Sequence, residues 1–235
     1  MDPVAFVAGA TGFTGREVVR VLAGRGLAVI AHVRPDSPRL AEWRTRFEAL
    51  GARVDATPWA PEPMAETLGR IGPTIAFSLL GTTKARQRRG SGSAVPDSYA
   101  AVEEGLTRLL LGAFARTGLA PRFVFLSSVG VHEGARSAYL AARWRIESAV
   151  RASGLPFTIA RPSFIVGPGR DEPRAVEAVA STVSDSLLGL AGRLGARRLR
   201  DRFRSTTNVA LAEALVRAAL DPASRDRVLE AEDLR

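Results

Sequence analysis

The sequence contains no cysteine and only two histidines, His32 and His132, among its 235 residues. The lack of cysteine excludes disulfide bonds, thiolate metal ligands and a cysteine nucleophile, and two histidines are too few for a histidine-rich metal cluster. No apolar run reaches the roughly 20 residues that a bilayer-spanning helix needs. No basic leader or cleavage signal is visible at the start of the sequence. We therefore expect a soluble, cytoplasmic protein with no metal centre and no membrane partner.

Lysine is almost absent as well, since Lys84 is the only one and the other 32 of the 33 basic residues are arginines. The formal net charge is +9, and a basic surface can attract nucleic acid. The arginines are scattered along the chain, however, and no nucleic-acid-binding motif accompanies them. We interpret them as a general preference for arginine over lysine, and keep nucleic-acid binding as a minor alternative.

Short apolar segments alternate with amphipathic ones through the first two thirds of the sequence. The pattern predicts strands at 4–9, 27–34, 52–57, 74–81, 122–131 and 156–163, and helices at 14–26, 38–51, 99–118 and 138–154. Apolar strands that alternate with helices are typical of a parallel sheet covered on both faces. We therefore predict an α/β fold, a doubly wound parallel sheet of the Rossmann type.

The sequence after residue 166 is less regular than the part before it. We predict helices near 174–194 and at 207–220, with an arginine-rich stretch between them. The interpretation is a main domain at 1–166 and a small C-terminal subdomain at 167–235 that lies over the strand ends and does not fold independently. The polar, glycine-rich segment Lys84–Ser98 predicts a mobile loop at the same edge, with the substrate between the two.

Three glycines, Gly9, Gly12 and Gly15, separate the first predicted strand from the first helix. Such a series provides a tight turn, a close backbone approach to a pyrophosphate and close helix–strand packing. The helix N-terminus adds unpaired N–H groups and a partial positive charge. The alternative is a glycine-rich turn without a ligand. The context predicts a dinucleotide phosphate site at Gly9, Thr11, Gly12, Phe13, Thr14 and Gly15.

The end of the second predicted strand bears on the choice of cofactor. Proteins that bind NAD place an acid there for the ribose hydroxyls, whereas an arginine there suits the 2′-phosphate of NADP. Arg34 occupies this place, and Asp36 follows beyond a proline. We therefore favour NADP(H) over NAD(H), with Arg16 as a further candidate contact. Asp55, after the third strand, either meets the adenine edge or is an ordinary turn residue.

Five motifs follow one another in a recognisable order: GATGFTG from Gly9, VRP from Val33, SLLGTT from Ser78, FLSSVGV from Phe125 and YLAAR from Tyr139. With these motifs the chain resembles the atypical short-chain dehydrogenases/reductases. It is most similar to the Tat-interacting-protein type of oxidoreductase, and more broadly to NmrA-like proteins. The resemblance is firm to about residue 168 and loose after it.

The resemblance implies further site residues and their roles. Leu80, Gly81 and Thr82 would line the cofactor ribose, Ser127 would be a further cofactor contact, and Ser128 and Tyr139 would face the nicotinamide. Pro162 and Ser163 would pass beside the nicotinamide carboxamide, with Ile165 close by. The implied reaction is hydride transfer to or from a small carbonyl or alcohol substrate.

The resemblance also implies a proton-transfer pair, but one member differs from the family pattern. The family has Tyr-x-x-x-Lys, and this sequence has Tyr139 and Arg143. A free tyrosine titrates near ~10, so a tyrosine base needs adjacent positive charge to work near neutral pH. Residues at i and i+4 share one face of a helix, so Arg143 can supply that charge. Arginine cannot release its proton, however, and therefore cannot relay protons as an amine can.

Two functional hypotheses stay open at this point. In the first, the protein is an NADP(H)-dependent oxidoreductase with Tyr139, Arg143 and Ser128 as catalytic residues. In the second, it binds NADP(H) with little turnover and reports the redox state of the cofactor, in which case a protein partner is expected.

Overall fold

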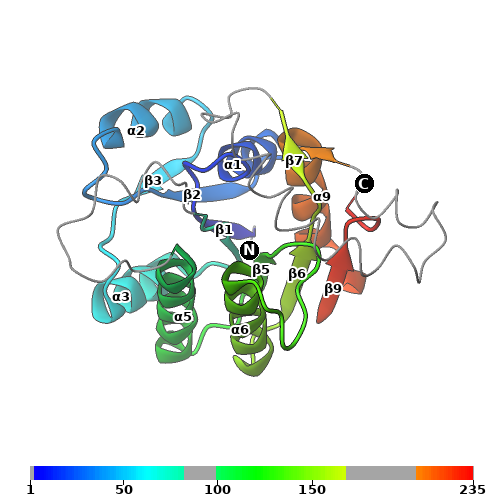
Figure 1. Ribbon diagram of the computed structural model, residues 1–235. Coiled ribbons are helices and arrows are strands. Elements are labelled where there is room, and N and C mark those ends of the chain that lie inside the picture. Colours follow the sequence, from blue (N-terminus) through cyan, green and yellow to red (C-terminus); the bar gives the residue numbers. More distant parts are fainter. Residues whose placement is uncertain (1–2, 82–98, 168–204, 235) are drawn as a thin grey trace.

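The computed structural model describes residues 3–81, 99–167 and 205–234. Its main sheet has seven parallel strands in the order β3-β2-β1-β4-β5-β6-β9, with helices on both faces (Figure 1). The strands are β1 Val4–Ala8, β2 Ala28–His32, β3 Arg53–Asp55, β4 Ile75–Ser78, β5 Arg122–Leu126, β6 Phe157–Arg161 and β9 Arg227–Glu230. Two short strands, β7 Ile165–Val166 and β8 Thr206–Thr207, pair separately. The predicted doubly wound parallel sheet is therefore confirmed.

The order of the strands reverses at β1, because β2 and β3 lie on one side of it and β4, β5 and β6 on the other. Ala8 pairs with Ser78, so β1 and β4 end side by side. In open parallel sheets, ligands bind outside the carboxyl ends of the strands at such a reversal. The fold thus places the candidate site at the ends of β1 and β4.

Each face of the sheet has its own layer of helices (Figure 1). One layer consists of α1 Gly15–Gly24, α2 Leu40–Glu48 and α9 Asn208–Leu220, and the other of α3 Pro61–Ile71, α5 Tyr99–Thr117 and α6 Ala138–Ala152. Successive residues of a strand point to opposite faces, so Val7 packs in the first layer and Phe6 in the second. Because both faces are covered, the strands are apolar almost throughout.

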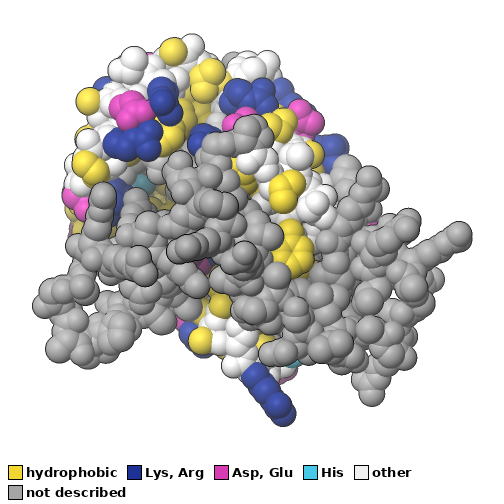
Figure 2. Space-filling model, turned by 45° about the horizontal axis from the view of Figure 1, so that its top comes forward, with side chains coloured by type: hydrophobic (Ala, Val, Ile, Leu, Met, Phe, Trp, Pro, Cys, Tyr) yellow, Lys and Arg dark blue, Asp and Glu magenta, His cyan; other side chains and the backbone are white. Residues whose placement is uncertain are grey.

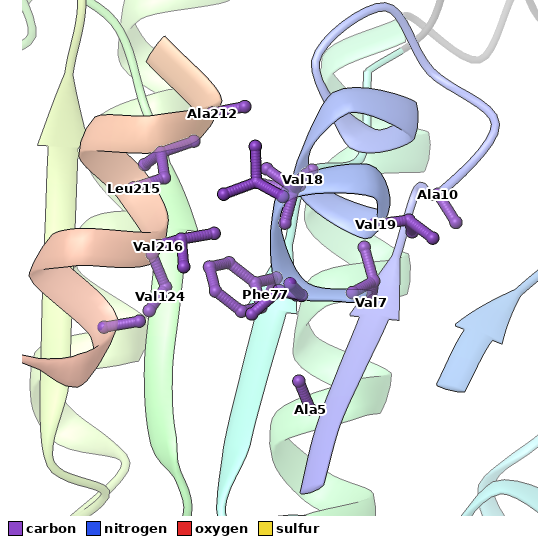
Figure 3. Close-up of a cluster of buried hydrophobic side chains, with 14 of the residues drawn as sticks. Ala5, Val7, Ala10, Val18, Val19, Phe77, Val124, Ala212, Leu215 and Val216 are labelled. Atoms are coloured by element: carbon purple, nitrogen blue, oxygen red, sulfur yellow. The ribbon is translucent and has the colours of Figure 1, made fainter. Parts of the chain in front are cut away.

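The core beneath α1 and α9 shows how the C-terminal part of the chain joins this domain (Figure 3). Val18 of α1 and Leu215 of α9 are fully buried together with Phe77 of β4 and Val124 of β5. Burial of such side chains stabilises the fold by about 1.5–3 kcal/mol each. Residues from both ends of the chain therefore build one hydrophobic core.

This arrangement corrects the domain division expected from the sequence. Within 208–234, α9 covers the main sheet beside α1, and β9 pairs with β6 as the seventh strand. The physical reason is the apolar composition of α9, which has eight buried positions and needs an apolar surface to cover them. The helix near 174–194 and the Lys84–Ser98 loop lie outside the described residues, so a substrate-covering role there stays a prediction.

Five elements within the described residues were not expected from the sequence: helix α3, the strands β7, β8 and β9, and a short 3-10 helix at Pro222–Ser224. Helix α3 begins at Pro61, where a proline suits the first helical turn, and ends at Gly72, which adopts a left-handed conformation with φ +60°. Strand β9 has only four residues.

In addition, β2 ends at His32, so Arg34 lies two residues beyond the strand rather than at its last position.

The basic side chains of α2 are paired with acidic ones. Arg39 and Arg46 contact Glu42, and Arg44 contacts Glu48. Basic and acidic side chains lie next to each other at the upper left of the face drawn in Figure 2, where α2 lies in Figure 1.

Across the described ranges, no helix is both long and apolar enough to cross a bilayer.

Candidate functional site

The glycine loop, residues 9–15, connects β1 to α1 and is held by close backbone contacts. Gly9 adopts φ +83°, and the Gly12 amide donates to the Gly9 carbonyl at 2.9 Å. A Cβ at Gly9 would lie 2.5 Å from the Leu79 carbonyl oxygen, and one at Gly15 would overlap the Gly9 carbonyl. Gly9 and Gly15 are therefore glycines for steric reasons, as the motif predicted.

The glycine loop presents the N-terminus of α1 at the reversal of the sheet. Thr14, at the N-cap position, makes no side-chain capping hydrogen bond. The Arg16 and Glu17 amides already donate to the Gly12 and Thr14 carbonyls, at 3.1 Å each, so an anion here would be held by the amides before Arg16 and by the partial positive charge of the helix N-terminus. A backbone cradle that a Cβ would fill, next to an uncapped helix N-terminus, fits a dinucleotide diphosphate. Thr11 and Phe13 lie in the same loop, half-buried.

Asn208, the first residue of α9, ties the C-terminal part of the chain to this loop. Its Nδ2 donates to the Phe13 carbonyl at 3.2 Å, and its side chain is almost fully buried. Its Oδ1 faces Gly167 and makes no hydrogen bond within the described ranges. The sequence analysis did not single out Asn208.

Arg34 lies beyond the end of β2 and forms an ion pair with Asp36, with Nη1 2.9 Å from Oδ2. The Arg34 side chain is 35% exposed and that of Asp36 69%. An exposed pair of this kind contributes about 0–1 kcal/mol, so a phosphate group can displace Asp36 from Arg34. Arg16, in contrast, lies over the Phe13 ring, 5.3 Å from its centroid.

Asp55 ends β3 and fixes the turn that follows it. Its two carboxylate oxygens accept hydrogen bonds from the amide and the hydroxyl of Thr57, at 3.1 and 2.9 Å. These contacts fit the turn interpretation of Asp55, and an adenine contact stays a prediction.

His32, the last residue of β2, contacts the same turn. Its Nε2 lies 2.8 Å from the Thr57 carbonyl, which can only accept, so Nε2 carries the proton. The ring packs against Trp59 with centroids 4.8 Å apart. Burial lowers the pKa of His32, and the opposing effects of the Thr57 carbonyl and Asp55 do not reverse this. His32 is therefore neutral in the folded protein at neutral pH.

Leu80 and Gly81 follow β4 at the same edge. The Leu79 amide donates to the Ala8 carbonyl, which holds this turn beside the glycine loop. A Cβ at Gly81 would lie 3.9 Å from Oε1 of Glu103 on α5. Thr82 lies outside the described residues.

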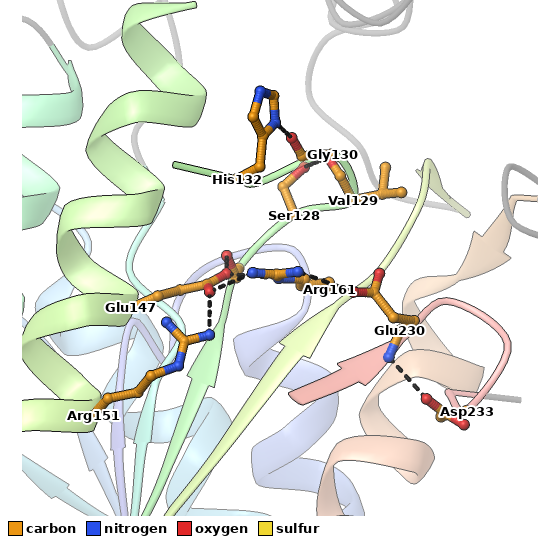
Figure 4. A network of polar contacts seen from close by, with 10 residues as sticks. Ser128, Val129, Gly130, His132, Glu147, Arg151, Arg161, Glu230 and Asp233 are labelled. Atoms are coloured by element: carbon orange, nitrogen blue, oxygen red, sulfur yellow. Dashed lines mark hydrogen bonds and ion pairs between the residues drawn. The ribbon is translucent and has the colours of Figure 1, made fainter. Parts of the chain in front are cut away.

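Ser127 follows β5 and is bonded to a buried polar network. Figure 4 shows Glu147, Arg161 and Glu230 of this network. Its hydroxyl donates to Oε1 of Glu147 at 2.6 Å, and Glu147 is fully buried. Arg161 donates to both Glu147 oxygens, at 2.9 and 2.7 Å, and reaches Glu230 at 3.0 Å. The bonds to Glu147 raise the pKa of Arg161. Because the Ser127 hydroxyl donates its proton to Glu147, this arrangement does not favour the expected contact between Ser127 and the cofactor.

Ser128, in contrast, keeps a hydroxyl that can donate to a ligand. It is half-buried, and its Oγ makes a long contact of 3.4 Å with the Val129 carbonyl. The Val129 amide donates to the Pro162 carbonyl at 2.9 Å, which brings Pro162 next to the end of β5. Ser163 is buried beside it, and Ile165 begins β7, partly buried against the core beneath α1.

Tyr139 and Arg143 lie one turn apart on α6, as the sequence predicted. Tyr139 is 42% exposed, and the Arg143 Cζ atom lies 5.2 Å from its ring centroid. Arg143 is buried; its Nη1 donates to the Leu126 carbonyl at 2.8 Å, and its Nη2 contacts Oε2 of Glu103 at 2.7 Å. The Nε of Arg143 is buried and has no hydrogen-bond partner within the described ranges. Arg143 thus joins α6 to the end of β5, two residues before Ser128.

The charge state of Arg143 follows from these neighbours. Burial alone would lower its pKa, but the Tyr139 side chain and the Glu103 carboxylate outweigh burial and raise it. Arg143 is therefore a fixed cation beside Tyr139.

Glu103, like Asn208, was not identified by the sequence analysis, although its helical spacing contains a signal for it. Glu103, Thr107, Leu110 and Phe114 recur at helical spacing, and all four are buried. An acid on such a stripe needs a buried partner of opposite charge.

The comparison with protein families decides the class of the protein. Residues 9–187, beginning at the first glycine of the loop, match a family described as NAD(P)H-binding. The chain belongs to this family. Together with its Rossmann-type sheet, the match identifies an NAD(P)-binding protein of the atypical short-chain dehydrogenase/reductase type, as the motifs implied.

Individual relatives agree with this assignment. A ceramide reductase from Caulobacter vibrioides is 32% identical over 169 residues, which are 72% of this chain but only 48% of the reductase. The mitochondrial protein fmp52-1 of Aspergillus oryzae is 29% identical over 90% of this chain and 84% of its own length. The UDP-N-acetylglucosamine 4-epimerase of Bacillus cereus shares the fold, with a TM-score of 0.63, 16% identity and coverage of 96% of this chain and 76% of that chain. The cytoplasmic location stays a prediction.

Proposed function

We propose that the protein is an NADP(H)-dependent oxidoreductase that interconverts a small carbonyl compound and its alcohol. The observation that carries the proposal is the pairing of half-exposed Tyr139 with the fixed cation Arg143, 5.2 Å from its ring, beside the end of β5. The glycine loop lies at the same edge of the sheet. The name of the ceramide reductase relative agrees with a reductive direction.

Each residue has a separate task in this reaction. When bound, the nicotinamide cofactor would supply a hydride for the carbonyl carbon. The Tyr139 hydroxyl gives its proton to the carbonyl oxygen, and the Ser128 hydroxyl donates a hydrogen bond that orients this oxygen. Arg143 stays a cation beside the tyrosinate that remains, with its charge offset by Glu103, and its buried Nε–H is a donor for a cofactor hydroxyl. In the reverse direction, Tyr139 accepts the proton of the alcohol.

The proposed preference for NADP(H) rests on Arg34. The weak pair with exposed Asp36 leaves its guanidinium able to turn to a 2′-phosphate, for which a planar two-pronged donor is suited. Leu80, Gly81 and Pro162, with Ser163 and Ile165, are the proposed contacts of the ribose and nicotinamide.

The test begins with NADPH binding, measured by calorimetry, followed by turnover of a panel of aldehydes, ketones and quinones. Tyr139→Phe is expected to lower kcat by about 100-fold or more, because proton transfer by a positioned side chain contributes about 10²–10⁴-fold. Its NADPH affinity should stay within about 3-fold of wild type, because the change removes one hydroxyl. Ser148→Ala is the matched control, because it also removes one hydroxyl from α6, but one that donates to the Trp144 carbonyl of the same helix, and it should keep full activity.

The second candidate is a redox-sensing protein with little turnover, and the Glu103–Arg143 pair favours it. The carboxylate lies 2.7 Å from the guanidinium and offsets the charge that activates a tyrosine. This function requires unequal affinities for NADPH and NADP⁺, because a ligand that binds two states equally shifts neither. NADPH binding with no turnover and a large difference between the two affinities would replace the oxidoreductase proposal. Absence of binding to either cofactor would contradict both.

A further inference from the structure

The Glu103–Arg143 ion pair joins α5 to α6, and its guanidinium carbon lies 5.2 Å from the centroid of the Tyr139 ring. Both side chains are 8% exposed, and the closest atoms are 2.7 Å apart. The guanidinium also lies against the Phe125 ring, 5.5 Å from its centroid, and donates to the Leu126 carbonyl. Arg143 is therefore held from three sides, by α5, by β5 and by its own helix.

Burial explains why an arginine in this place needs a carboxylate. A buried cation without a partner is costly, and a paired one is tolerated only when its geometry and remaining hydrogen bonds are good. Glu103 meets this need through its contact with Nη2, while the Leu126 carbonyl takes Nη1. The pair as a unit carries no net charge.

The neutral pair changes what Tyr139 experiences. A cation within about 4–6 Å favours an ionised neighbour, and an anion at similar range opposes it. The described ionisable groups that act on Arg143 are Tyr139 and Glu147 of α6 and Glu103 of α5. The charge of Glu147 is balanced by its own partners, Arg151 and Arg161. Glu103 is therefore the described anion in direct contact with the cation beside Tyr139.

We propose that Glu103 is a positioning residue that fixes the Arg143 guanidinium beside Tyr139 and offsets its charge, so that the pair, and not the arginine alone, sets the ionisation of Tyr139. Its consequence for catalysis rests on the proposed function, because it concerns the same tyrosine. The electrostatic effect itself exists without cofactor or substrate. A Cβ at Gly81 would lie 3.9 Å from Oε1 of Glu103, so this carboxylate is also close to the turn after β4.

The composition of the chain allows a direct test. The sequence has two tyrosines, Tyr99 and Tyr139, so a full-length Tyr99→Phe protein has Tyr139 as its single titrating phenol. Ionisation of Tyr139 can then be followed by the ultraviolet absorbance of tyrosinate in the absence of any ligand. Circular dichroism at each pH defines the range in which the protein remains folded.

In this background, Glu103→Gln removes the anion but keeps a hydrogen-bonding side chain of the same size. We expect the midpoint of the tyrosinate titration to move to lower pH by about one unit, because Arg143 is then uncompensated. Glu104→Gln is the matched control on the same helix. Glu104 pairs with Arg108 and Arg145 at the surface, and its removal should leave the midpoint unchanged.

The double variant Glu103→Gln/Arg143→Gln separates charge compensation from a merely structural role. If the pair acts as a neutral unit, loss of both charges leaves the midpoint close to that of the Tyr99→Phe parent. A rise of about one unit would mean that Arg143 acts alone, and would overturn the proposal. An unchanged midpoint in folded Glu103→Gln would overturn it as well. If Glu103→Gln does not fold, the neutral double variant still gives the decisive comparison.

These outcomes are independent of the test of function. A shift without any turnover would support the charge compensation and contradict the oxidoreductase, whereas turnover without a shift would do the reverse. Where a substrate is found, the pH profile of kcat for alcohol oxidation should move in Glu103→Gln by the same amount as the titration midpoint. The Glu103→Asp variant, which keeps the charge, should restore the parent profile.

Discussion

The glycine loop and the Tyr139–Arg143 face of α6 belong to one proposed site, but different interactions hold them in place. The loop is fixed by backbone approach, with Gly9 against Leu79 and Gly15 against Gly9. The helix face depends on side chains that meet in a buried layer, with Glu103 and Glu147 as the anions. Close backbone contacts of this kind are destabilised when a side-chain atom is added. Buried ion pairs are destabilised when one of the two charges is removed.

We expect the largest effect, on the free energy of unfolding, from a change at Glu147, in the part of the site that depends on buried ion pairs. Glu147→Ala removes a fully buried carboxylate and leaves Arg161 and Ser127 without their main partner. Breaking a buried pair costs about 3–5 kcal/mol, so the free energy of unfolding should fall by about that much. Chemical denaturation followed by circular dichroism measures it.

Glu213→Ala is the control for this change, because Glu213 is exposed on α9. A surface substitution of this kind should stay within about 0.5 kcal/mol of wild type. If both variants lost equal stability, the network around Glu147 would not be the element that joins α6 to β6.

In the glycine loop, which close backbone contacts hold in place, Gly15→Ala should lower NADPH affinity by about 100-fold. The added Cβ overlaps the Gly9 carbonyl, so the loop must move, and overpacking of this kind costs about 1–3 kcal/mol. Calorimetry gives the affinity. Gly24→Ala in the same helix has open space around it and should raise stability by about 0.5–1 kcal/mol without changing affinity. Equal affinity in wild type and Gly15→Ala would show that the loop does not hold the cofactor.

The same contrast explains what could be predicted from the sequence. The glycine loop was predictable because strand, turn and helix follow one another within a few residues, and each glycine has a local steric reason. The Tyr139–Arg143 spacing was predictable for the same reason. Glu103 was not, because its partner comes from another helix, and only the fold brings α5 beside α6. Strand β9 was missed because four residues at the edge of a sheet have little periodicity of their own.

The variant Arg34→Asp tests a third kind of contact, an exposed side chain at the proposed position of the adenosine 2′-phosphate. We expect NADPH affinity to fall by about 10-fold while NADH affinity changes little, because the 2′-phosphate loses its cation and meets an anion. Arg44→Asp makes the same charge change on exposed α2 and serves as the control for long-range attraction. Parallel losses in both variants would assign the effect to net charge, and an unchanged preference would mean that Arg34 does not contact the phosphate.

The smallest effect concerns His32, the last residue of β2, which packs against Trp59. Burial lowers the pKa of His32, so in the range below the ordinary value of 6.5 the unfolded chain binds a proton that the folded chain does not. The free energy of unfolding should therefore be at its full value above this range and decline as the pH falls through it. His32→Gln should flatten this decline, because glutamine keeps a donor toward the Thr57 carbonyl but does not titrate. His132→Gln, at the exposed second histidine, should leave the decline as in wild type, and denaturation curves at several pH values would distinguish the two.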